Sequence, residues 1–210
     1  MELLQKVTLY DLLGYALPGG VVVGLCGWHG MFGEIEYSEF PLTLLLILWF
    51  AAGYLLGIII SEMTEVIKPV DRKKQGFFKE ICDNYGIELD CLNRALKRAQ
   101  ILEDSKSMSD FKDLERYEGY IYSIIQVDSK YNRIHNYGSG ELLYKNMALA
   151  AVAAVILGIR FGVIPEMLIG IVGTIFFIKR YERFYKRRTG YTLCWFLDKF
   201  NCKEDKEENE

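Results

Sequence analysis

Few side chains of this 210-residue chain have the chemistry and the spacing that catalysis needs. The two histidines are His29 and His135, and the longest apolar run of the chain lies between them. The sequence contains no HExxH or GxSxG motif, no phosphate loop and no dinucleotide-binding glycine pattern. The GSG at 138–140 lacks the preceding strand of a phosphate loop, and we interpret it as a helix break. The sequence therefore predicts no catalytic residue and no enzyme.

The cysteines and carboxylates are poorly spaced for a metal site. The cysteines are Cys26, Cys82, Cys91, Cys194 and Cys202. Their number is odd and their spacing is neither CxxC nor that of a zinc finger, which favours reduced thiols in the cytosol. The acidic group Asp110, Asp113, Glu115 and Glu118 is interspersed with Lys112 and Arg116. Such a mixture is typical of a solvated helix face, so we expect no metal and no cofactor.

A ligand or partner site is one interpretation of the aromatic and basic residues between positions 117 and 137. They are Tyr117, Tyr120, Tyr122, Tyr131, Arg133, His135 and Tyr137. Ring stacking and positive charge would suit a nucleotide or a short nucleic acid. The alternative is that most of these rings pack in a core or an interface. The formal net charge of −3 provides no large basic field, so double-stranded nucleic acid is not an expected partner.

The element that must position everything else is the uncharged run at 41–60, PLTLLLILWFAAGYLLGIII. As a helix it would be roughly 30 Å long, which matches the hydrocarbon core of a bilayer. The alternative is the central helix of a soluble protein, which would need apolar neighbours on all sides and is usually shorter. We interpret the run as a transmembrane helix.

A first span is predicted at 12–28, because apolar character continues too far for a cleaved signal peptide. Residues 3–17 would form an amphipathic lead-in at the membrane surface. Pro18 is followed by two glycines and should bend or restart the helix, since proline removes a backbone hydrogen bond.

Glycines and small hydroxyl residues are the candidates for helix packing and for lining a pore. Glycines four residues apart share a helix face and allow close packing, although glycine is also simply common in membrane helices. Uncharged spans offer no selectivity ring, so a pore would be lined by backbone or small polar groups, or gated by apolar dewetting. The candidates are Gly20, Gly24, Gly53, Gly57, Thr43, Ser61 and Thr174.

The distribution of lysine and arginine predicts the orientation in the membrane. The connection at 29–40 is acidic and lacks both residues, whereas several basic residues follow soon after position 60. The positive-inside rule therefore places 61–144 and the N-terminus in the cytoplasm. Apolar residues at helical spacing within 61–144 predict two or three packed helices, with breaks at Pro69, Gly86 and 136–140.

A second apolar region consists of two runs, 147–159 and 167–178, each too short to span alone. If Arg160 and Glu166 snorkel to the outer surface or pair there, around Gly162 and Pro165, a tight transmembrane hairpin forms. A soluble or re-entrant hairpin is the alternative. Two crossings would return the basic segment after 178 to the cytoplasm, as the charge rule requires.

The segment 179–202 is both basic and aromatic. Its basic cluster is Lys179, Arg180, Arg183, Lys186, Arg187 and Arg188. The segment either lies at the headgroups as an amphipathic helix or continues the fourth helix into the cytosol and packs on the middle domain. Residues 203–210 are almost all charged and predict a disordered tail.

These patterns predict an all-α membrane protein with two transmembrane helical hairpins, four spans in all, and a helical cytoplasmic domain inserted between them. The predicted divisions are 1–60, 61–144, 145–178, 179–202 and 203–210. We expect a multi-pass homo-oligomer in the lipid bilayer with both termini in the cytoplasm. A gated channel is one function that fits, and a non-conducting anchor or scaffold that recruits a cytosolic partner through 61–144 is the alternative.

Two stretches, YDLLGYALPGG at 10–20 and KRYERFYKRRTGYTLCWF at 179–196, resemble a diffuse group of small bacterial membrane proteins. Members of that group often look like effectors of phage-defence operons, as in CBASS-like and Hailong systems, where a nucleotide-transferase partner controls a membrane channel. The resemblance implies a channel or membrane-depolarising effector in the bacterial inner membrane. It also implies control of the cytoplasmic domain by a nucleotidyltransferase-type partner or by a nucleotide or oligonucleotide.

Overall fold

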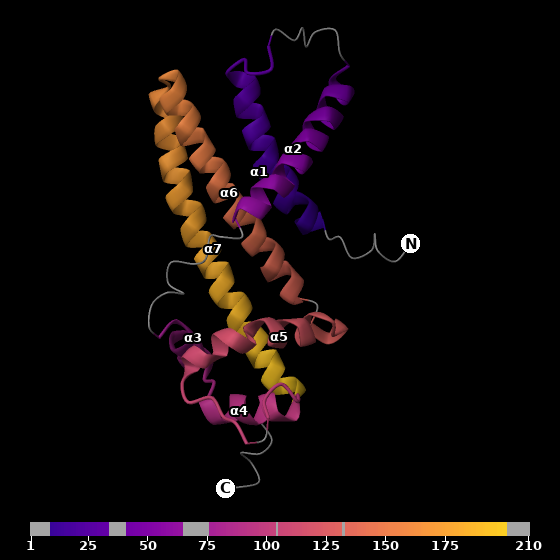
Figure 1. The fold of residues 1–210 in the computed structure, drawn as a ribbon. Coiled ribbons are helices and arrows are strands. Elements are labelled where there is room, and N and C mark those ends of the chain that lie inside the picture. Colours follow the sequence, from indigo (N-terminus) through magenta and orange to yellow (C-terminus); the bar gives the residue numbers. More distant parts are fainter. Residues whose placement is uncertain (1–8, 34–40, 65–75, 104, 132, 201–210) are drawn as a thin grey trace. The chain divides into compact units, whose positions relative to one another are not determined.

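The computed structural model describes residues 9–33, 41–64, 76–103, 105–131 and 133–200. Within these residues the regular structure is helical, so the prediction of an all-α chain is confirmed. Figure 1 labels the α-helices, which are α1 (Leu9–Trp28), α2 (Leu42–Thr64), α3 (Phe77–Tyr85), α4 (Leu89–Arg98), α5 (Leu114–Gln126), α6 (Arg133–Phe161) and α7 (Ile164–Lys199). Short 3₁₀ turns, Phe111–Asp113 and Ser129–Tyr131, precede α5 and α6.

The helices form two compact units. The first, which we call the apolar unit, holds the described residues of 1–68 and 139–183. The second, the polar unit, holds those of 69–138 and 184–210. Both α6 and α7 contribute residues to both units. Each unit is therefore assembled from segments that are far apart in the sequence.

Two helices, α2 and α6, are long and apolar enough to cross a membrane. Only 17% of the most apolar 18-residue stretch of α2 is buried, whereas the central helix of a soluble protein would be mostly buried. Many of its exposed side chains are large and apolar: Leu42, Leu44, Leu46, Ile47, Leu48, Leu55, Ile58, Ile59 and Met63. The exposure of α2 therefore favours lipid over a protein core as its surroundings.

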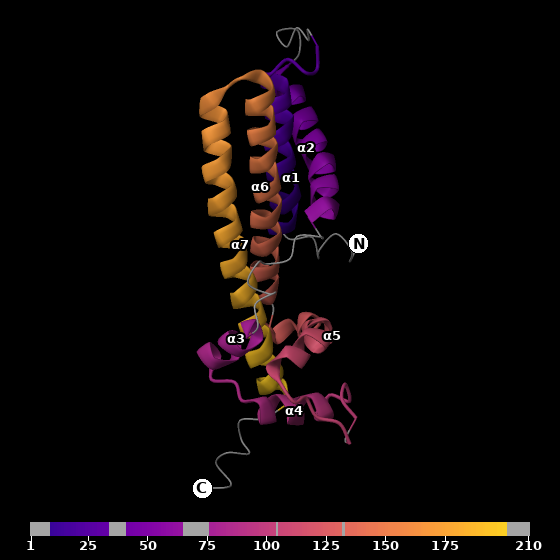
Figure 2. The same cartoon turned by 60° about the vertical axis from the view of Figure 1, so that its left-hand side comes forward.

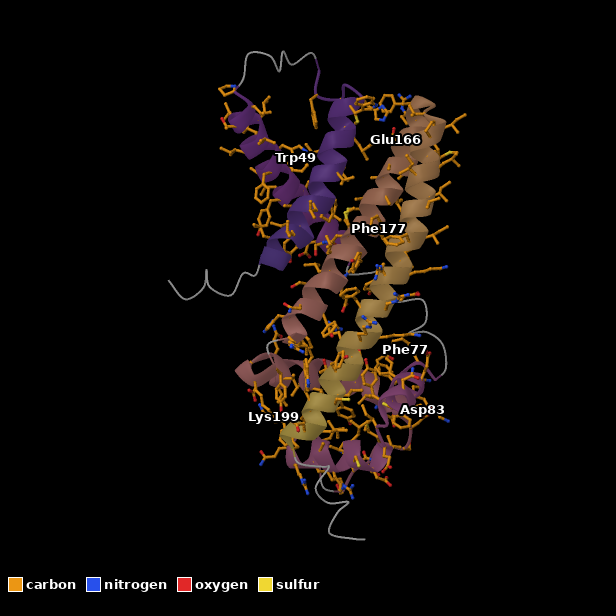
Figure 3. The ribbon with its side chains drawn as sticks, turned by 180° about the vertical axis from the view of Figure 1, so that it is seen from behind. Trp49, Phe77, Asp83, Glu166, Phe177 and Lys199 are labelled. Atoms are coloured by element: carbon orange, nitrogen blue, oxygen red, sulfur yellow. The ribbon has the colours of Figure 1, made fainter. Side chains whose placement is uncertain are left out.

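Helices α1 and α2 cross where glycines let the two backbones meet (Figure 1). A Cβ on Gly53 would lie 2.8 Å from the amide nitrogen of Gly20, and a Cβ on Gly57 would overlap the carbonyl group of Tyr15. Trp49 covers Gly20 from α2 (Figure 3). Gly24 stands outside this tight contact, because the atom nearest to its Cβ position is 3.9 Å away. The close approach predicted from the glycine spacing thus joins two helices of one subunit.

Helix α1 runs without interruption through Pro18, so the expectation that the proline restarts the helix is wrong. Proline lacks an N–H and leaves the carbonyl of the residue four positions earlier, Gly14, without its helical donor. The side-chain amide of Asn146 on α6 donates to this carbonyl at 3.1 Å and replaces the lost bond. Residues 3–8 of the predicted lead-in lie outside the described residues.

Helix α6 also runs through a predicted break, since 136–140 lies inside it. Each glycine there costs the helix about 1 kcal/mol relative to alanine. Packing offsets this cost: Ile134 is fully buried, and the ring of Tyr137 stacks on Tyr191 at a centroid distance of 5.1 Å. The apolar run at 147–159 is therefore part of a 29-residue helix.

A tight turn joins α6 to α7 around Gly162 (Figure 2). Gly162 has a φ of 71°, which favours glycine, and the Val163 N–H donates to the Gly158 carbonyl at 2.8 Å. Glycine again allows close packing, because a Cβ on Gly170 would lie 2.8 Å from the carbonyl oxygen of Ala151. Helix α7 then continues to Lys199, so of the two arrangements considered for 179–202 the structure has the continuous helix.

The polar unit has an ordinary hydrophobic core. Its fully buried large side chains include Leu92, Leu96, Leu114, Ile121, Ile125, Ile134 and Phe196. Helix α3 ends at Gly86, whose φ of 63° and αL conformation confirm the break predicted there. Pro69, the other predicted break in this part of the chain, lies outside the described residues.

The glycine contact between α1 and α2 predicts a sharp difference between two alanine substitutions. Gly57→Ala should lower the free energy of unfolding by about 1–3 kcal/mol, because its methyl group overlaps backbone that cannot move independently. Gly24→Ala, which adds the same methyl group where there is room, should change stability by less than about 0.5 kcal/mol. Thermal unfolding of the purified variants in one detergent measures both effects, and equal stabilities would contradict the contact.

Candidate functional site

A buried polar link joins three helices of the apolar unit. Thr64 at the end of α2 is fully buried, and its hydroxyl oxygen lies 2.9 Å from the side-chain oxygen of Asn146 and 2.8 Å from the carbonyl oxygen of Ser61. Its single hydrogen donates to one of these acceptors at a time. Asn146, also fully buried, donates from its amide nitrogen to Gly14 of α1. The link therefore satisfies a backbone carbonyl that Pro18 leaves open.

A second polar contact lies at the turn between α6 and α7. The Nε2 atom of His29 is 2.8 Å from Oε2 of Glu166, and only 5% and 12% of the two side chains are exposed. The imidazole stacks on the ring of Phe161, with centroids 4.1 Å apart and planes within 7°. Glu166 therefore pairs with His29 and not with Arg160. The Arg160 side chain is exposed, and its guanidinium lies 5.9 Å from the centroid of the Phe161 ring. Of the two alternatives considered for this turn, snorkelling or pairing, the pairing of Arg160 with Glu166 does not occur among the described residues.

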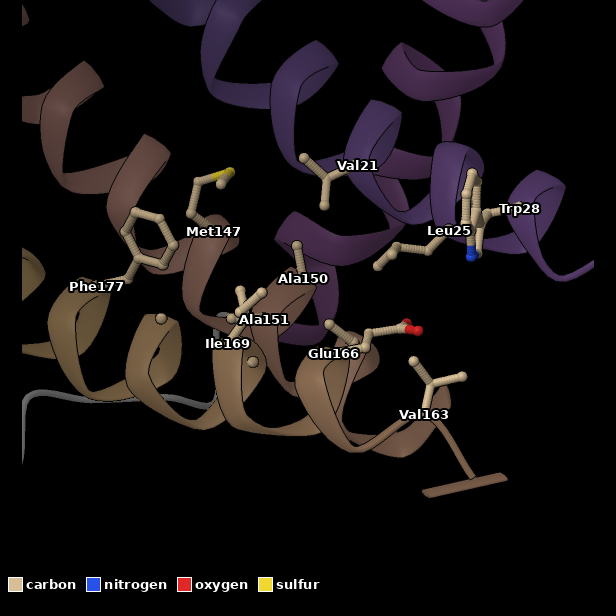
Figure 4. Close-up of a pocket in the computed structure, with 13 residues that line it drawn as sticks. Val21, Leu25, Trp28, Met147, Ala150, Ala151, Val163, Glu166, Ile169 and Phe177 are labelled. Carbon is tan, nitrogen blue, oxygen red and sulfur yellow. The ribbon is translucent and has the colours of Figure 1, made fainter. Parts of the chain in front are cut away.

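An apolar pocket of about 490 Å³ opens beside this contact (Figure 4). Helix α1 contributes Val21, Leu25 and Trp28 to its wall. The opposite side consists of alanines and glycines of α6 and α7 together with larger side chains such as Met147 and Phe177. Among the described residues that line it, Glu166 is the charged one, and Figure 4 shows its carboxylate on the side where Leu25 and Trp28 lie. The volume is in the range of about 300–1,000 Å³ typical of small-molecule pockets.

In the polar unit, Glu118 is the centre of a polar cluster between α5 and α7. The Tyr185 hydroxyl lies 3.0 Å from both carboxylate oxygens, and the Thr189 hydroxyl donates to Oε1 at 3.2 Å. Arg188 lies 3.5 Å from the same oxygen, and its guanidinium lies over the rings of Tyr122 and Tyr185. Only 12% of the Glu118 side chain is exposed, so the prediction of a solvated acidic face is wrong for this residue.

The basic residues predicted to lie at the headgroups have different surroundings. Lys186 pairs with Glu80 of α3 at 2.9 Å, and Arg188 pairs with Glu118, so both contact carboxylates of the polar unit. In the apolar unit, the Arg180 guanidinium lies over the rings of Tyr144 and Phe176. The exposed members of the cluster are Lys179, Arg183 and Arg187.

Four aromatic rings of the polar unit form a continuous stack. Tyr137 contacts Tyr191 at 5.1 Å, Tyr191 contacts Trp195 at 5.6 Å, and Trp195 contacts Tyr131 at 5.5 Å, with interplanar angles of 22–26°. Burial raises the pKa of both Tyr131 and Tyr137. One face of each of these two rings is therefore covered by an α7 side chain.

The other members of the predicted ligand site make no ring contact with this stack in the part of the chain that the structure describes. Tyr120 on α5 is 64% exposed and Tyr117 is half-buried. Arg133 is exposed and His135 half-buried in the first turns of α6. Across the described residues, no ring contact joins Tyr117 or Tyr120 to Tyr131 or Tyr137. A nucleotide would therefore meet individual side chains here and not an open aromatic platform.

The hydroxyl residues proposed to line a pore are placed differently from one another. Thr43 is exposed on α2, and Ser61 is half-buried near the end of the same helix. The hydroxyl of Thr174 donates to the carbonyl of Gly170 in its own helix at 2.8 Å. Thr174 is therefore bonded within its own helix, whereas Thr43 and Ser61 lie near opposite ends of α2.

The sequence contains signals for two contacts that its local patterns did not predict. Pro18 requires a donor for the Gly14 carbonyl, and Asn146 is the polar residue that directly precedes the apolar run at 147–159. His29 and Glu166 are ionisable residues, each near one of the two predicted hairpin turns. Both pairs unite parts of the chain more than a hundred positions apart, with separations of 132 and 137 residues, so no local pattern connects them.

Comparisons with protein-family models, with curated proteins and with solved structures found no match. No activity, ligand or partner is therefore transferred to this chain from a relative. A function must therefore be inferred from the geometry of the two units. The apolar unit has a polar link, an ionisable pair and a pocket, and the polar unit has a packed core.

The polar link predicts a measurable coupling between Thr64 and Asn146. Asn146→Leu should destabilise the protein more than Thr64→Val, because it leaves the Gly14 carbonyl without a donor. The double variant should lose less than the sum of the two, with a coupling free energy of about 0.6 kcal/mol and at most about 1.7 kcal/mol. Unfolding in mixed micelles measures the cycle. Thr174→Val is the matched control, and additivity of Thr64→Val and Asn146→Leu would contradict the link.

The environment of Cys82 predicts an unreactive thiol. The side chain is 0% exposed, and burial, together with the nearby Asp83 carboxylate, raises its pKa to about 12. Because alkylation requires the thiolate, a variant that keeps Cys82 as its one cysteine should react with iodoacetamide at pH 8.5 about a thousandfold more slowly folded than unfolded. The thiolate forms more readily in the unfolded chain, so the polar unit should lose stability as the pH rises from about 9 towards 12. Equal alkylation rates in native buffer and in denaturant would refute this.

Proposed function

We propose that this chain is a multi-pass membrane protein with four spans, contributed by α1, α2 and the apolar-unit parts of α6 and α7. In this proposal the polar unit and both termini are cytoplasmic, and the protein acts as a homo-oligomeric gated channel or membrane-depolarising effector in a bacterial inner membrane. The observation that carries the proposal is the broad, exposed, apolar surface of the apolar unit.

The exposed residues of this surface are large. On α2 they include Ile47 and Leu55, which are 65% and 64% exposed, and on α7 they include Ile169 and Val172, which are 72% and 69% exposed. Leaving one such side chain in water instead of an apolar medium costs about 1.5–3 kcal/mol. Soluble monomers rarely expose contiguous patches of this kind, whereas a span surrounded by lipid requires them.

The charge pattern supports four spans in place of two. The α6–α7 hairpin carries Arg160 and Glu166 at its turn and the exposed Lys179 and Arg183 near the opposite end of its apolar stretch. If both arms cross the membrane, Lys179 and Arg183 lie on the cytoplasmic side, together with the basic residues that follow α2. The apolar stretch of α7 is shorter than a full span, and snorkelling of the flanking Lys179 side chain or local thinning of the bilayer accommodates the difference.

Gating is supported by the continuity of α6 and α7, which contribute residues to both units without a break. A ligand that binds one conformation of the polar unit better than another biases these helices, and therefore the spans that they continue into. The resemblance of 10–20 and 179–196 to effectors of phage-defence operons suggests a nucleotide, an oligonucleotide or a nucleotidyltransferase as that regulator. Because the spans carry few polar groups, we expect a pore at the interface between subunits that is gated by dewetting.

A scaffold remains the second candidate, and one observation favours it. The close glycine contacts of α1 with α2 and of α6 with α7 are made inside a single subunit, as is the Thr64–Asn146 link. Helix packing in the apolar unit is thus satisfied without a second copy. A monomeric anchor that recruits a cytosolic partner has the same internal contacts.

Ion flux distinguishes the two candidates. The purified full-length protein in liposomes should dissipate a potassium gradient faster than empty liposomes, and addition of cyclic or linear oligonucleotides should change the rate. Arg133→Gln should weaken this response, whereas Arg116→Gln on the exposed face of α5 should leave it unchanged. Oligomeric state in detergent is measured on the same samples.

Two outcomes would overturn the channel. A protein that inserts into the liposomes but shows no flux with or without oligonucleotide is a scaffold. Cysteine labelling in inverted and right-side-out vesicles tests the membrane assignment separately. Labels at positions 120 and 187 on opposite sides of the membrane would contradict the four-span topology.

A further inference from the structure

We propose that the apolar pocket beside the His29–Glu166 contact binds one membrane lipid with a primary ammonium headgroup. One acyl chain fills the pocket, and the ammonium donates a hydrogen bond to Glu166. This inference rests on the proposed membrane location of the apolar unit.

The shape of the pocket suits a hydrocarbon chain. The pocket has a volume of about 490 Å³ and lies between α1 and the α6–α7 hairpin. Figure 4 shows Phe177 at one end of the pocket and Trp28 at the other. Alanines and glycines, among them Ala150, Ala154 and Gly173, leave the space open on the hairpin side. An apolar cavity of this kind does not hold ordered water well, whereas an acyl chain finds contacts along its whole length.

The carboxylate of Glu166 supplies the specificity. Its Oε2 accepts from His29, but Oε1 is buried and, among the residues that the structure describes, finds no hydrogen-bond donor. A buried acceptor without a donor costs about 1–3 kcal/mol, and more when it is charged. A primary ammonium offers three N–H donors and an opposite charge. A quaternary ammonium, as in choline lipids, has no N–H and leaves the oxygen unpaired.

A lipid fits better than a free amine because the helix ends that carry this carboxylate also carry a cation: Arg160 lies in the last turn of α6 and Glu166 in the first turn of α7. Glu166 contacts His29, His29 stacks on Phe161, and the exposed guanidinium of Arg160 lies 5.9 Å from the Phe161 ring centroid. A carboxylate in the pocket and an exposed arginine at the neighbouring helix end match the ammonium and the phosphate of a zwitterionic aminophospholipid.

Binding of defined lipids to the delipidated full-length protein tests the proposal. Native mass spectrometry in mild detergent should show about tenfold tighter binding of phosphatidylethanolamine than of phosphatidylcholine with the same chains. Glu166→Gln keeps an acceptor for His29 and should abolish this preference. Val21→Trp, which fills the pocket from α1, should weaken both lipids, whereas Ile47→Trp on the exposed face of α2 should weaken neither.

Dodecylamine separates the two sources of an ammonium group. Arg160→Gln should weaken phosphatidylethanolamine several-fold and leave dodecylamine unchanged. Equal loss of both, or no loss of either, would overturn the lipid in favour of a free amine. Equal binding of the two phospholipids by the unmodified protein, or a preference that survives Glu166→Gln, would overturn the site itself.

Flotation with phosphatidylcholine vesicles separates failure of this inference from failure of the proposed function. A protein that floats but has no headgroup preference keeps the membrane assignment and loses the lipid site. A protein that does not float loses both.

Discussion

The apolar unit depends on one requirement: every buried backbone polar group needs a hydrogen-bond partner inside the protein. Pro18 violates this requirement locally, because it cannot donate to the carbonyl of Gly14. Asn146 of α6 meets it with its side-chain amide, and its oxygen lies within hydrogen-bonding distance of the hydroxyl of Thr64 on α2. The carbonyl that Pro18 leaves open is therefore linked to α6 through Asn146, and Asn146 is linked to α2 through Thr64. The pocket of the same unit lies between α1 and the α6–α7 hairpin.

The two units differ in the size of the side chains that they bury. In the apolar unit, glycines such as Gly53 and Gly57 form the helix contacts, while large side chains such as Ile47 face outward. In the polar unit, large side chains such as Leu92 and Phe196 are fully buried. Water drives apolar groups together, whereas lipid does not, and helices in lipid associate through close backbone packing and hydrogen bonds. The proposed membrane location of the apolar unit would account for this contrast.

Charged groups also differ between the units. In the polar unit, Glu118 is surrounded by hydroxyl groups and an arginine, and Lys186 has a carboxylate partner in Glu80. In the apolar unit, Glu166 has one oxygen bonded to His29 and the other buried without a donor among the described residues. A buried charged acceptor without a donor is costly, and the ammonium group of the proposed lipid would supply that donor.

The sequence by itself determined the helical class, the apolar run that becomes α2, and the turns at Gly86 and Gly162, because periodicity, length and glycine conformation are local properties. It did not determine that helices continue through Pro18 and through 136–140, since distant contacts offset the local cost of those residues. Tertiary structure alone paired Glu166 with His29 and brought Asn146 to Gly14. Those partners are separated by 137 and 132 positions, and only the folded backbone brings their side chains within hydrogen-bonding distance.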